Sequence, residues 1–529
     1  MNPAEIKKGY LENRAIFRNT KLVLCIVLLI ILYTCYMVVE IPDSDEVGMY
    51  ILFTHHGLIY SATQWVAPGN HVFYLVLSSI VDSITGNTLL GIRGVSYIFA
   101  VVNAILFYKL LTERITTDKS LRVIATLGYG LINGVSKYSV RGRGYTLCNF
   151  FTICSIYLVI KLISEKECKR YLIGLVVCFA FGLYTVPTFV YSIIPLVLYL
   201  LIHCFVIKDY RLLKELAISG VLTGAAVFCL YLPIFICLGL RSLYPEIQEQ
   251  SFSLSVGIQA MKSFLADPLE TVGVGIARYL SISSEYTGSI PISKVFNGLG
   301  NELADIACFV TYGGRITVLN ILLLILSLTG IISVVKESVL ARISLLYMIC
   351  VVPLMIVQRV LPFYRVYLYL AVPVSIGLGY FVSFIIKRTR RIHSRTVIVM
   401  TAVFLGFQIV WSVYGLSPDR QTGRDCSAYK AVKQIDLDET KTFLMGGYMQ
   451  EEYLTCELIS HHMDGEYLVD RYKPDCIILS REQMEPGFDK VSDFNMLSYD
   501  DIPWEWINRN MSVYYEDEKL VGYIADRKN

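Results

Sequence analysis

Charged residues are scarce in this chain. They make up 17% of its 529 positions, whereas soluble domains carry about 25%, so a surface that faces water on all sides is not indicated. The 14 cysteines form no C-x-x-C pair and no Cys/His ligand spacing, which favours small packing residues over metal or redox chemistry. The sequence also lacks low-complexity tracts and internal repeats, and its net charge of +3 is too small to indicate a nucleic-acid partner.

Apolar residues, in contrast, come in long unbroken runs. The first run, at residues 21–39, reads KLVLCIVLLIILYTCYMVV, and about 20 apolar residues match a hydrocarbon core of about 30 Å. This run is longer than the apolar region of a signal peptide, about 7–15 residues, and no small-residue cleavage site follows it. The sequence therefore predicts an integral membrane protein whose first span is retained.

The apolar runs predict an all-α polytopic membrane protein with about eleven transmembrane helices. The expected spans are residues 19–41, 89–111, 121–138, 142–163, 171–186, 187–207, 214–240, 316–336, 341–358, 363–387 and 396–416. Basic residues, 23 in all, gather in segments 1–21, 109–122, 161–170, 208–214, 336–342 and 387–395. Residues 42–92 contain no Lys or Arg. Because cytoplasmic loops hold the excess of basic residues, the N-terminus is expected to be cytoplasmic.

This orientation requires that the apolar stretch His71–Ile84 does not cross the membrane. Its fourteen residues make a helix of about 21 Å, which is too short for a span. We therefore expect an outer interfacial helix there, with Trp65 and Tyr74 as possible anchors. The resulting topology has a first external loop at 42–88 and a large external loop at 241–315.

The composition changes after residue 416, where Asp, Glu and Lys become frequent. Residues 1–416 are therefore expected to form a transmembrane domain, and residues 417–529 a small soluble α/β domain outside the membrane. Lys441–Tyr448 and Asp475–Ser480 are expected to be strands, with a helix at Gln450–His462 between them. The second domain shows no nucleophile or metal constellation, so docking or acceptor shaping is its default role.

The first external loop opens with the sequence IPDSDEVGMY, which places Asp43, Asp45 and Glu46 at the end of the first span. Carboxylates also simply mark the ends of spans, and that alternative stays open. No cation lies near them in sequence, so we expect unpaired carboxylates with raised, coupled pKa values. Such groups serve as a general base or as metal ligands. A divalent metal held by Asp43, Asp45 and His71 is an option that the spacing does not require.

Further polar residues are expected on the same side of the membrane. His71 starts the interfacial helix and could bind substrate, a metal or a phosphate, or be a hydrogen-bonded structural residue. Arg143 lies between two glycines in KYSVRGRGY, and cations on the less basic side indicate an anionic lipid phosphate. Arg359 and Arg365 flank the sequence LPFY and form a second candidate for phosphate binding.

In their order and shared sidedness, these motifs resemble those of the GT-C glycosyltransferases, specifically the bacterial relatives of protein O-mannosyltransferases and aminoarabinose transferases. The matching residues are Asp45-Glu46, Asn70-His71 with Phe73-Tyr74, Arg143-Gly144-Tyr145, Tyr184 to Pro187, and Arg365 to Pro373. The resemblance covers residues 1 to about 415.

The resemblance implies a polyprenyl-phosphate sugar as donor, and an acceptor hydroxyl of a glycan, lipid or protein outside the plasma membrane. It implies Asp45 as the catalytic base, with Glu46 orienting that base or holding a substrate. The implied substrate-binding residues are His71, Arg143, Tyr145, Tyr184 and Arg365. The two arginines would hold the donor phosphate. A single carboxylate base opposite the leaving group predicts inversion at the anomeric carbon.

Two other functions compete with this one. A transporter or flippase for lipid-linked glycans would place ionisable residues inside its spans. The expected spans are nearly free of charge, with Glu215 and Glu337 at their ends, which favours catalysis at an outer face. A non-enzymatic scaffold that works through the C-terminal domain would leave the acidic first loop unexplained.

Overall fold

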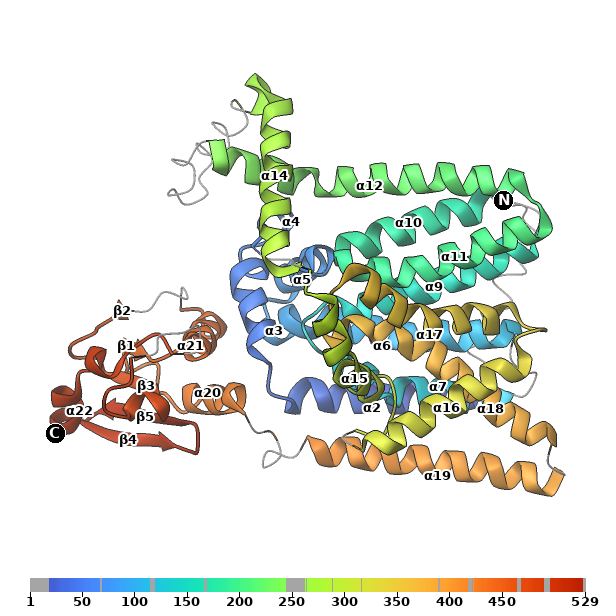
Figure 1. Ribbon diagram of the computed structural model, residues 1–529. Helices are drawn as coiled ribbons and strands as arrows, with labels where there is room; N and C mark the ends of the chain where they lie inside the picture. Colours follow the sequence, from blue (N-terminus) through green and yellow to red (C-terminus); the bar gives the residue numbers. More distant parts are fainter. Residues whose placement is uncertain are drawn as a thin grey trace.

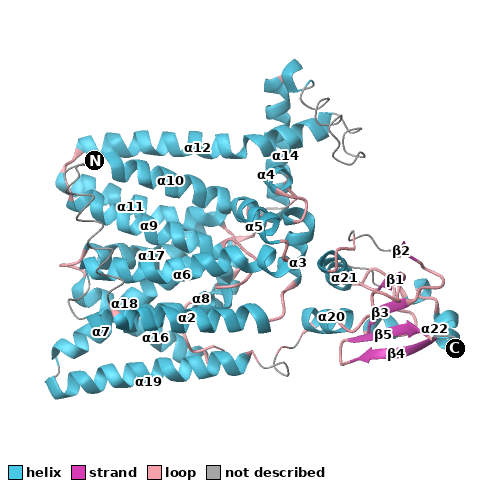
Figure 2. Ribbon diagram, turned by 180° about the vertical axis from the view of Figure 1, so that it is seen from behind, coloured by secondary structure: helices cyan, strands magenta, loops and turns pink. Residues whose placement is uncertain are grey.

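Figure 1 shows the computed structural model of the chain. It describes residues 19–66, 69–114, 119–165, 169–243, 262, 264–287, 289–314, 316–388, 391–416, 421, 423–463, 468–489 and 495–526. The long helices lie side by side in one bundle, and a smaller unit with a sheet lies beyond one end of that bundle (Figures 1 and 2).

The bundle consists of long apolar helices. They are α2 (Thr20–Val39), α6 (Thr88–Arg114), α7 (Lys119–Leu131), α9 (Tyr145–Ser164), α10 (Lys169–Thr185), α11 (Val190–Ile207), α12 (Tyr210–Leu243), α16 (Thr317–Val334), α17 (Val339–Gln358), α18 (Ala371–Arg388) and α19 (Arg391–Gly415). Each expected span thus corresponds to a helix. Within the described residues, nine helical segments are long and apolar enough to cross a membrane, so the chain is a multi-pass membrane protein.

The two expected spans that fall short of this criterion have local causes. The span expected at 121–138 is broken at Ile132, whose ψ of 136° is not helical, and continues as the short helix α8 (Asn133–Tyr138). The backbone N–H of Asn133 donates to the carbonyl of Thr311 instead of continuing the helix. Helix α10 stops at Thr185 because the residue before Pro187 is extended, as residues before proline usually are.

The loop expected at 241–315 is largely helical where it is described. Helix α14 (Pro268–Thr287) packs across the end of α12, and α15 (Ile292–Phe309) follows it. The close α12–α14 approach depends on Gly239 and Gly275, where a Cβ atom would collide with the backbone carbonyl of the facing helix. In Figure 1, α14 runs across the direction of the bundle helices at one end of the bundle.

Short helices gather at this same end of the bundle (Figure 1). They are α3 (Ser44–Met49), η1 (Tyr50–Thr54), α4 (Leu58–Thr63) and α5 (Val72–Thr85). Helix α5 is the apolar stretch expected at the interface, and with 14 residues it is too short to span. It ends at Gly86, which has a left-handed φ of 58° that glycine adopts readily.

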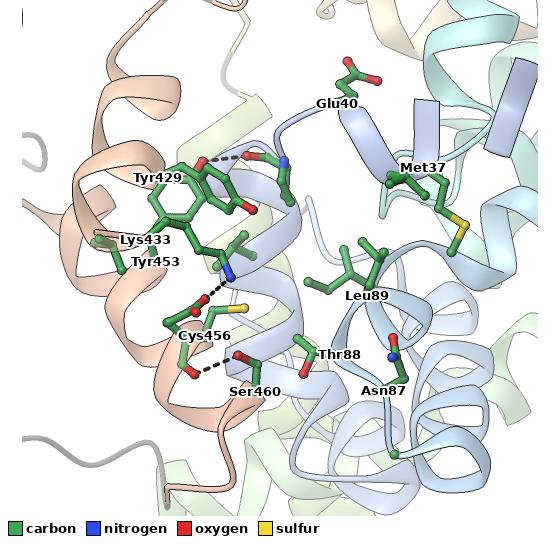
Figure 3. A pocket seen from close by; sticks show the side chains of 17 residues that line it. Met37, Glu40, Asn87, Thr88, Leu89, Tyr429, Lys433, Tyr453, Cys456 and Ser460 are labelled. Carbon is green, nitrogen blue, oxygen red and sulfur yellow. Dashed lines mark hydrogen bonds and ion pairs between the residues drawn. The ribbon is translucent and has the colours of Figure 1, made fainter. Parts of the chain in front are cut away.

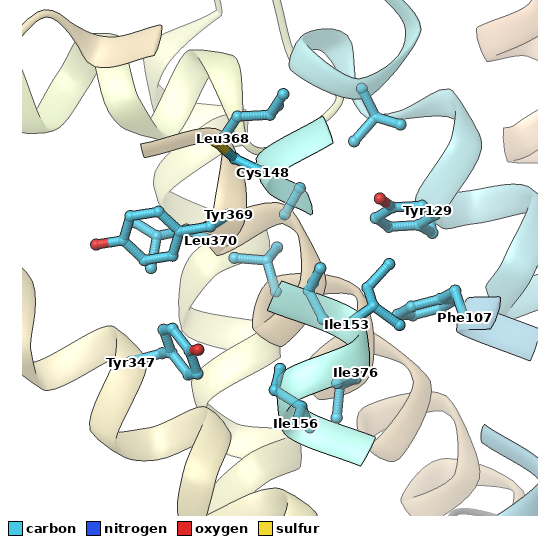
Figure 4. Packing of buried hydrophobic residues seen from close by; sticks show 14 of the residues in the cluster. Phe107, Tyr129, Cys148, Ile153, Ile156, Tyr347, Leu368, Tyr369, Leu370 and Ile376 are labelled. Carbon is cyan, nitrogen blue, oxygen red and sulfur yellow. The ribbon is translucent and has the colours of Figure 1, made fainter. Parts of the chain in front are cut away.

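A large apolar core supports the segment that precedes α18. Phe107 of α6 stacks on Tyr129 of α7 with ring centroids 4.5 Å apart. Figure 4 shows these two rings on one side of Ile153 of α9, with Tyr347 on the other side together with Leu368 and Tyr369. Both of the last two residues belong to the 3-10 segment η4 (Tyr364–Leu370) and are buried. Because this segment is packed on several helices, its first turn is held at a defined position.

The C-terminal unit contains a five-stranded mixed sheet of order β2-β1-β3-β5-β4. Its elements are α20 (Arg424–Val432), β1 (Thr442–Met445), α21 (Tyr448–Ser460), β2 (Leu468–Val469), β3 (Cys476–Ser480), η6 (Glu482–Met484), η7 (Tyr499–Asp501), α22 (Trp504–Asn510), β4 (Met511–Glu516) and β5 (Leu520–Ala525). Strands β1, β2 and β3 are parallel, whereas β5 pairs antiparallel with both β3 and β4. The two expected strands and their connecting helix are β1, β3 and α21; the antiparallel pair was not expected.

Candidate active site at the end of the bundle

Helix α3 carries the acidic motif, and its start is a capping box. The side chain of Asp43 accepts the backbone N–H of Glu46 at 2.9 Å, and Glu46 accepts the backbone N–H of Asp43 at 3.4 Å. An acidic residue followed by Glu three positions later is a known signal for a helix start. The motif therefore begins a helix directly after α2 leaves the bundle.

Glu46 is buried and paired. One of its carboxylate oxygens, Oε2, accepts Nε of Arg93 at 3.0 Å, and both side chains are at most 1% exposed. The same oxygen accepts the backbone N–H of Gly142 at 3.0 Å. Arg93 also donates to the carbonyls of Met37 and Glu40. Glu46 thus joins α3 to α6, to the end of α2 and to the loop before α9.

Arg93 was not among the residues selected from the sequence. A signal was available, because Arg93 is the first basic residue after the cation-free stretch 42–92 and lies near the start of an apolar helix. A charge at such a place needs a partner.

The expectation of unpaired carboxylates was wrong for all three acids. Asp43 accepts a hydrogen bond from Nη1 of Arg141 at 2.7 Å. Asp45 is also paired, as described below. The cations come from α6 and later segments, which the tertiary fold brings to α3. Burial and the nearby Glu46 nevertheless raise the pKa of Asp43, although Arg141 acts in the opposite direction.

Asp45 lies between two arginines. Its Oδ2 atom is 2.9 Å from Nη1 of Arg365 and 3.5 Å from Nη2 of Arg143. The Asp45 side chain is 45% exposed, whereas that of Arg143 is 6% exposed. The fold therefore brings together Asp45, Arg143 and Arg365, which were all selected from the sequence. It leaves the carboxylate of Asp45 accessible, whereas the guanidinium group of Arg143 is buried.

The two arginines retain donors that no described group satisfies. Nε and Nη1 of Arg143 and Nε of Arg365 are buried and have no hydrogen-bond partner among the described residues. Buried polar groups in proteins are nearly always paired, and an unpaired guanidinium donor is costly. The arrangement therefore fits an anion with several acceptor oxygens, such as a phosphate.

His71 adds a further donor to this group. Its Nδ1 accepts the backbone N–H of Gly144 at 3.1 Å, so the neutral ring carries its proton on Nε2. Nε2 is buried and without a partner among the described residues. Burial, followed by the charges of Arg143 and Arg365, holds the pKa of His71 well below its ordinary value, so the ring is neutral at pH 7.

The remaining expected substrate residues have mainly packing contacts. Tyr145 starts α9, and its ring lies edge-on to that of His71 at 4.7 Å. Tyr184 packs on Phe73 and Tyr231 in an aromatic cluster. Arg359 does not lie in this group with Arg365. The side chain of Arg359 is exposed, and its backbone carbonyl accepts a hydrogen bond from the backbone N–H of Ile290.

The metal option of Asp43, Asp45 and His71 finds no support in the geometry. Each of the three has a different partner: Arg141 for Asp43, arginines 143 and 365 for Asp45, and the Gly144 N–H for His71. In the part of the chain that is described, no group of three or more His, Cys, Asp or Glu side chains could hold a metal ion.

A cavity of about 330 Å³ lies on the opposite side of α3, between the C-terminal unit and the ends of α2 and α6. Figure 3 shows Lys433 and Tyr453 on one of its walls and Met37 and Leu89 on the other. Its α3 residue is Val47, two positions after Asp45, and residues two apart on a helix do not share a face. The cavity is therefore separate from the arginine pair.

Comparisons with known proteins agree with this fold. Residues 71–233 match the family described as dolichyl-phosphate-mannose-protein mannosyltransferase. The structure of ArnT from Cupriavidus metallidurans bound to undecaprenyl phosphate is similar over 95% of this chain and 97% of that one, with a TM-score of 0.55 and 10% identity. The apo state of that protein gives a TM-score of 0.53 with the same identity and coverage.

An oligosaccharyltransferase of Archaeoglobus fulgidus has a TM-score of 0.49 and 13% identity over 96% of this chain and 73% of that one. No curated protein matches the sequence. The resemblance inferred from the motifs is confirmed by the family match at residues 71–233 and by the fold shared with ArnT.

Proposed function

We propose that this protein transfers a sugar from a polyprenyl-phosphate donor to an acceptor hydroxyl outside the membrane, with Asp45 as the catalytic base. The observation that carries the proposal is the set of unpaired buried donors on Arg143, Arg365 and His71, next to a half-exposed carboxylate. Cationic donors suit a leaving phosphate, and an accessible carboxylate suits a proton acceptor.

The reaction uses these groups in two roles. The carboxylate of Asp45 takes the proton of the acceptor hydroxyl while the hydroxyl oxygen bonds to the anomeric carbon. The bond between that carbon and the phosphate oxygen breaks, and the electron pair stays on the phosphate. Arg143 and Arg365 stabilise the added negative charge. Attack opposite the leaving group inverts the anomeric carbon.

Asp45 forms ion pairs with Arg143 and Arg365. When a donor phosphate takes up the guanidinium donors, the arginines exchange the carboxylate for the phosphate, and Asp45 becomes available to the acceptor. Glu46 does not take part directly, because its oxygens are occupied by Arg93 and Gly142. We assign it the role of holding α3 in position.

A lipid-linked donor agrees with the location of the group. The charged cluster lies at the end of α2, next to the interfacial helix α5, where the phosphate of a membrane lipid would lie. The related ArnT structure was obtained with undecaprenyl phosphate bound. The basic segments lie toward the other ends of the helices, and the positive-inside tendency then puts the site and the C-terminal unit outside the plasma membrane.

The test is the variant Asp45→Asn, assayed for transfer from a labelled polyprenyl-phosphate sugar in membranes. General-base catalysis contributes roughly 10²–10⁴-fold, so we expect the rate to fall by at least about a hundredfold. Asp438→Asn, at an exposed position of the C-terminal unit, is the matched control and should retain full activity. Full activity of a folded Asp45→Asn protein would remove Asp45 as the base.

A further inference from the structure

The C-terminal unit is attached to the segment that carries the acidic motif. The hydroxyl of Tyr453 on α21 donates to the carbonyl of Pro42 at 2.7 Å. The backbone N–H of Ser44 donates to Asp425 at 3.3 Å. Val47 of α3 is 1% exposed and lies among the apolar side chains of the C-terminal unit. Helix α3 is therefore packed between the bundle and this unit.

Glu452 of α21 lies directly against α3. One carboxyl oxygen, Oε1, occupies the place that a Cβ atom of residue 48 would take, so a larger residue at position 48 would displace the carboxyl group. The side chain is 7% exposed. Its other oxygen, Oε2, is buried and has no hydrogen-bond partner among the described residues. Because Gly48 follows Asp45 by three positions, both lie on one face of α3.

The charges that act most on Glu452 are all negative. They come from Asp45 on α3, Asp425 on α20 and Glu451 on α21 itself, whereas a hydrogen bond with Tyr448 acts in the opposite direction. Burial is the largest cause, and together these effects raise the pKa of Glu452 to about 8.

The cations on elements around α21 have other partners. On α20, Arg424 pairs with Glu482 and Lys430 donates to the carbonyl of Gln421. Arg93 of α6 pairs with Glu46, and Lys433, which follows α20, pairs with Glu457 of α21. The segment η1, which also packs on α21, contributes Tyr50, whose hydroxyl donates to Asp82. A neutral carboxylic acid at position 452 is therefore the form that this contact accommodates.

We propose that Glu452 is a positioning residue that holds α3 and Asp45 in place in its protonated form. The inference rests on the proposed function and adds the C-terminal unit to the site. Loss of the proton places a negative charge beside Asp45 and Asp425, and the like-charge repulsion shifts α3. Sugar transfer should therefore fall as the pH rises through the pKa of Glu452.

The same contact predicts a proton uptake when α21 docks on α3. A released Glu452 has an ordinary pKa of 4.5, whereas the docked residue has one of about 8. Docking is therefore most favourable below pH 4.5 and weakens as the pH rises from 4.5 to 8. A glutamine at this position removes the dependence, because it does not ionise.

The first experiment compares pH profiles of kcat in the full-length protein. Wild type should lose activity above pH 8, by about tenfold per pH unit for a single ionisation, whereas Glu452→Gln should remain active there. Glu505→Gln, on α22, is the control and should retain the wild-type profile. An unchanged alkaline limb in folded Glu452→Gln would overturn the inference.

Asp425→Asn provides a second variant. The amide oxygen can still accept the N–H of Ser44, but one charge that raises the pKa of Glu452 is lost. The decrease of kcat at alkaline pH should therefore begin at a lower pH than in wild type. This change is opposite to that expected for Glu452→Gln, which should remain active at alkaline pH. A limb that stays in place would contradict the inference even if Glu452→Gln does not fold.

Hydrogen exchange separates this inference from the proposed function. The rate of backbone amide hydrogen exchange at residues 44–49 is measured in wild type and in Glu452→Gln at the same pH. The ratio of the wild-type rate to the variant rate should rise between pH 6 and 8. A rising ratio without any sugar transfer would support the contact and reject the function. A constant ratio in a protein that transfers sugar would reject the inference alone.

Discussion

Arg365 and Asp45 are 320 positions apart in the sequence, and Nη1 of the arginine lies 2.9 Å from Oδ2 of the aspartate. This ion pair joins the segment before α18 to the helix that follows the first span. Arg143 reaches the same oxygen from a third segment. The candidate site therefore exists only when the ends of α2, α9 and α18 are assembled.

Replacing Arg365 with Ala should weaken donor binding. A hydrogen bond to a charged group contributes roughly 1.5–3 kcal/mol, so the KM for the donor should rise by about tenfold or more. Arg359→Asn is the matched control, since Arg359 is exposed and has a left-handed φ of 54°, which asparagine tolerates. Donor titrations of both variants decide the question; equal KM values would remove Arg365 from the phosphate site.

Glu46→Gln should destabilise the protein and lower its activity together. Removing one partner of a buried ion pair costs roughly 3–5 kcal/mol, and Arg93 would lose its charged partner at 0% exposure. Thermal unfolding in detergent measures the effect. Glu215→Gln, which breaks an exposed pair with Arg211, should cost less than about 1 kcal/mol. Loss of activity at unchanged stability would instead indicate a direct catalytic role for Glu46.

His71 should make stability dependent on pH on the acid side. Its pKa in the folded protein lies well below the value of 6.5 that applies after unfolding, so the unfolded state binds more protons below pH 6.5. The free energy of unfolding should therefore fall as the pH drops from 7 to 5, by up to about 1.4 kcal/mol per unit. His71→Gln should show a smaller decrease over this range. Identical slopes for the two proteins would contradict a buried neutral histidine.

Gly144→Ala should disturb the site, whereas Gly69→Ala should not. A Cβ atom at 144 would lie 2.5 Å from Cγ2 of Thr185 and 2.8 Å from Nδ1 of His71, whereas one at 69 would lie 3.7 Å from Nη2 of Arg143. Overpacking costs roughly 1–3 kcal/mol. Thermal unfolding and transfer rates of the two variants should differ accordingly. Equal behaviour would show that the loop before α9 can shift without loss.

Cysteine labelling from outside the cell tests the orientation. Ile84, at the end of α5, is 79% exposed, and Ile84→Cys should react with an impermeant reagent above the background of the native cysteines. Lys119→Cys, at the start of α7, should react only after permeabilisation. The reverse pattern would place Asp45 and its arginines on the cytoplasmic side and exclude an external acceptor.

The sequence was sufficient to place the long apolar helices, although only nine helical segments among the described residues are long and apolar enough to cross a membrane. Runs of apolar residues require a membrane, and each of the eleven expected spans corresponds to a helix in the structure. The length of His71–Ile84 predicts that this stretch does not cross the membrane, and the helix α5 found there has 14 residues. The breaks at Ile132 and before Pro187 were harder to place, because the first depends on a hydrogen bond to Thr311, a partner far along the chain.

The acidic motif illustrates the limit of local reasoning. Three carboxylates without a cation in the surrounding 51 residues suggested unpaired acids, yet Arg93, Arg141, Arg143 and Arg365 reach them from later segments. Charge pairing acts through space and not along the chain, so no local pattern could assign these partners. The division of work between Asp45 and Glu46 likewise depends on burial.

The sequence by itself determined a helical membrane protein with a polar cluster at one end, because hydrophobicity and charge are properties of the residues. Only the tertiary structure decided which carboxylate is accessible, which donors lack partners and that Glu452 lies against Gly48. These three features depend on distances between segments that are remote in the chain, and the packing of those segments sets the distances.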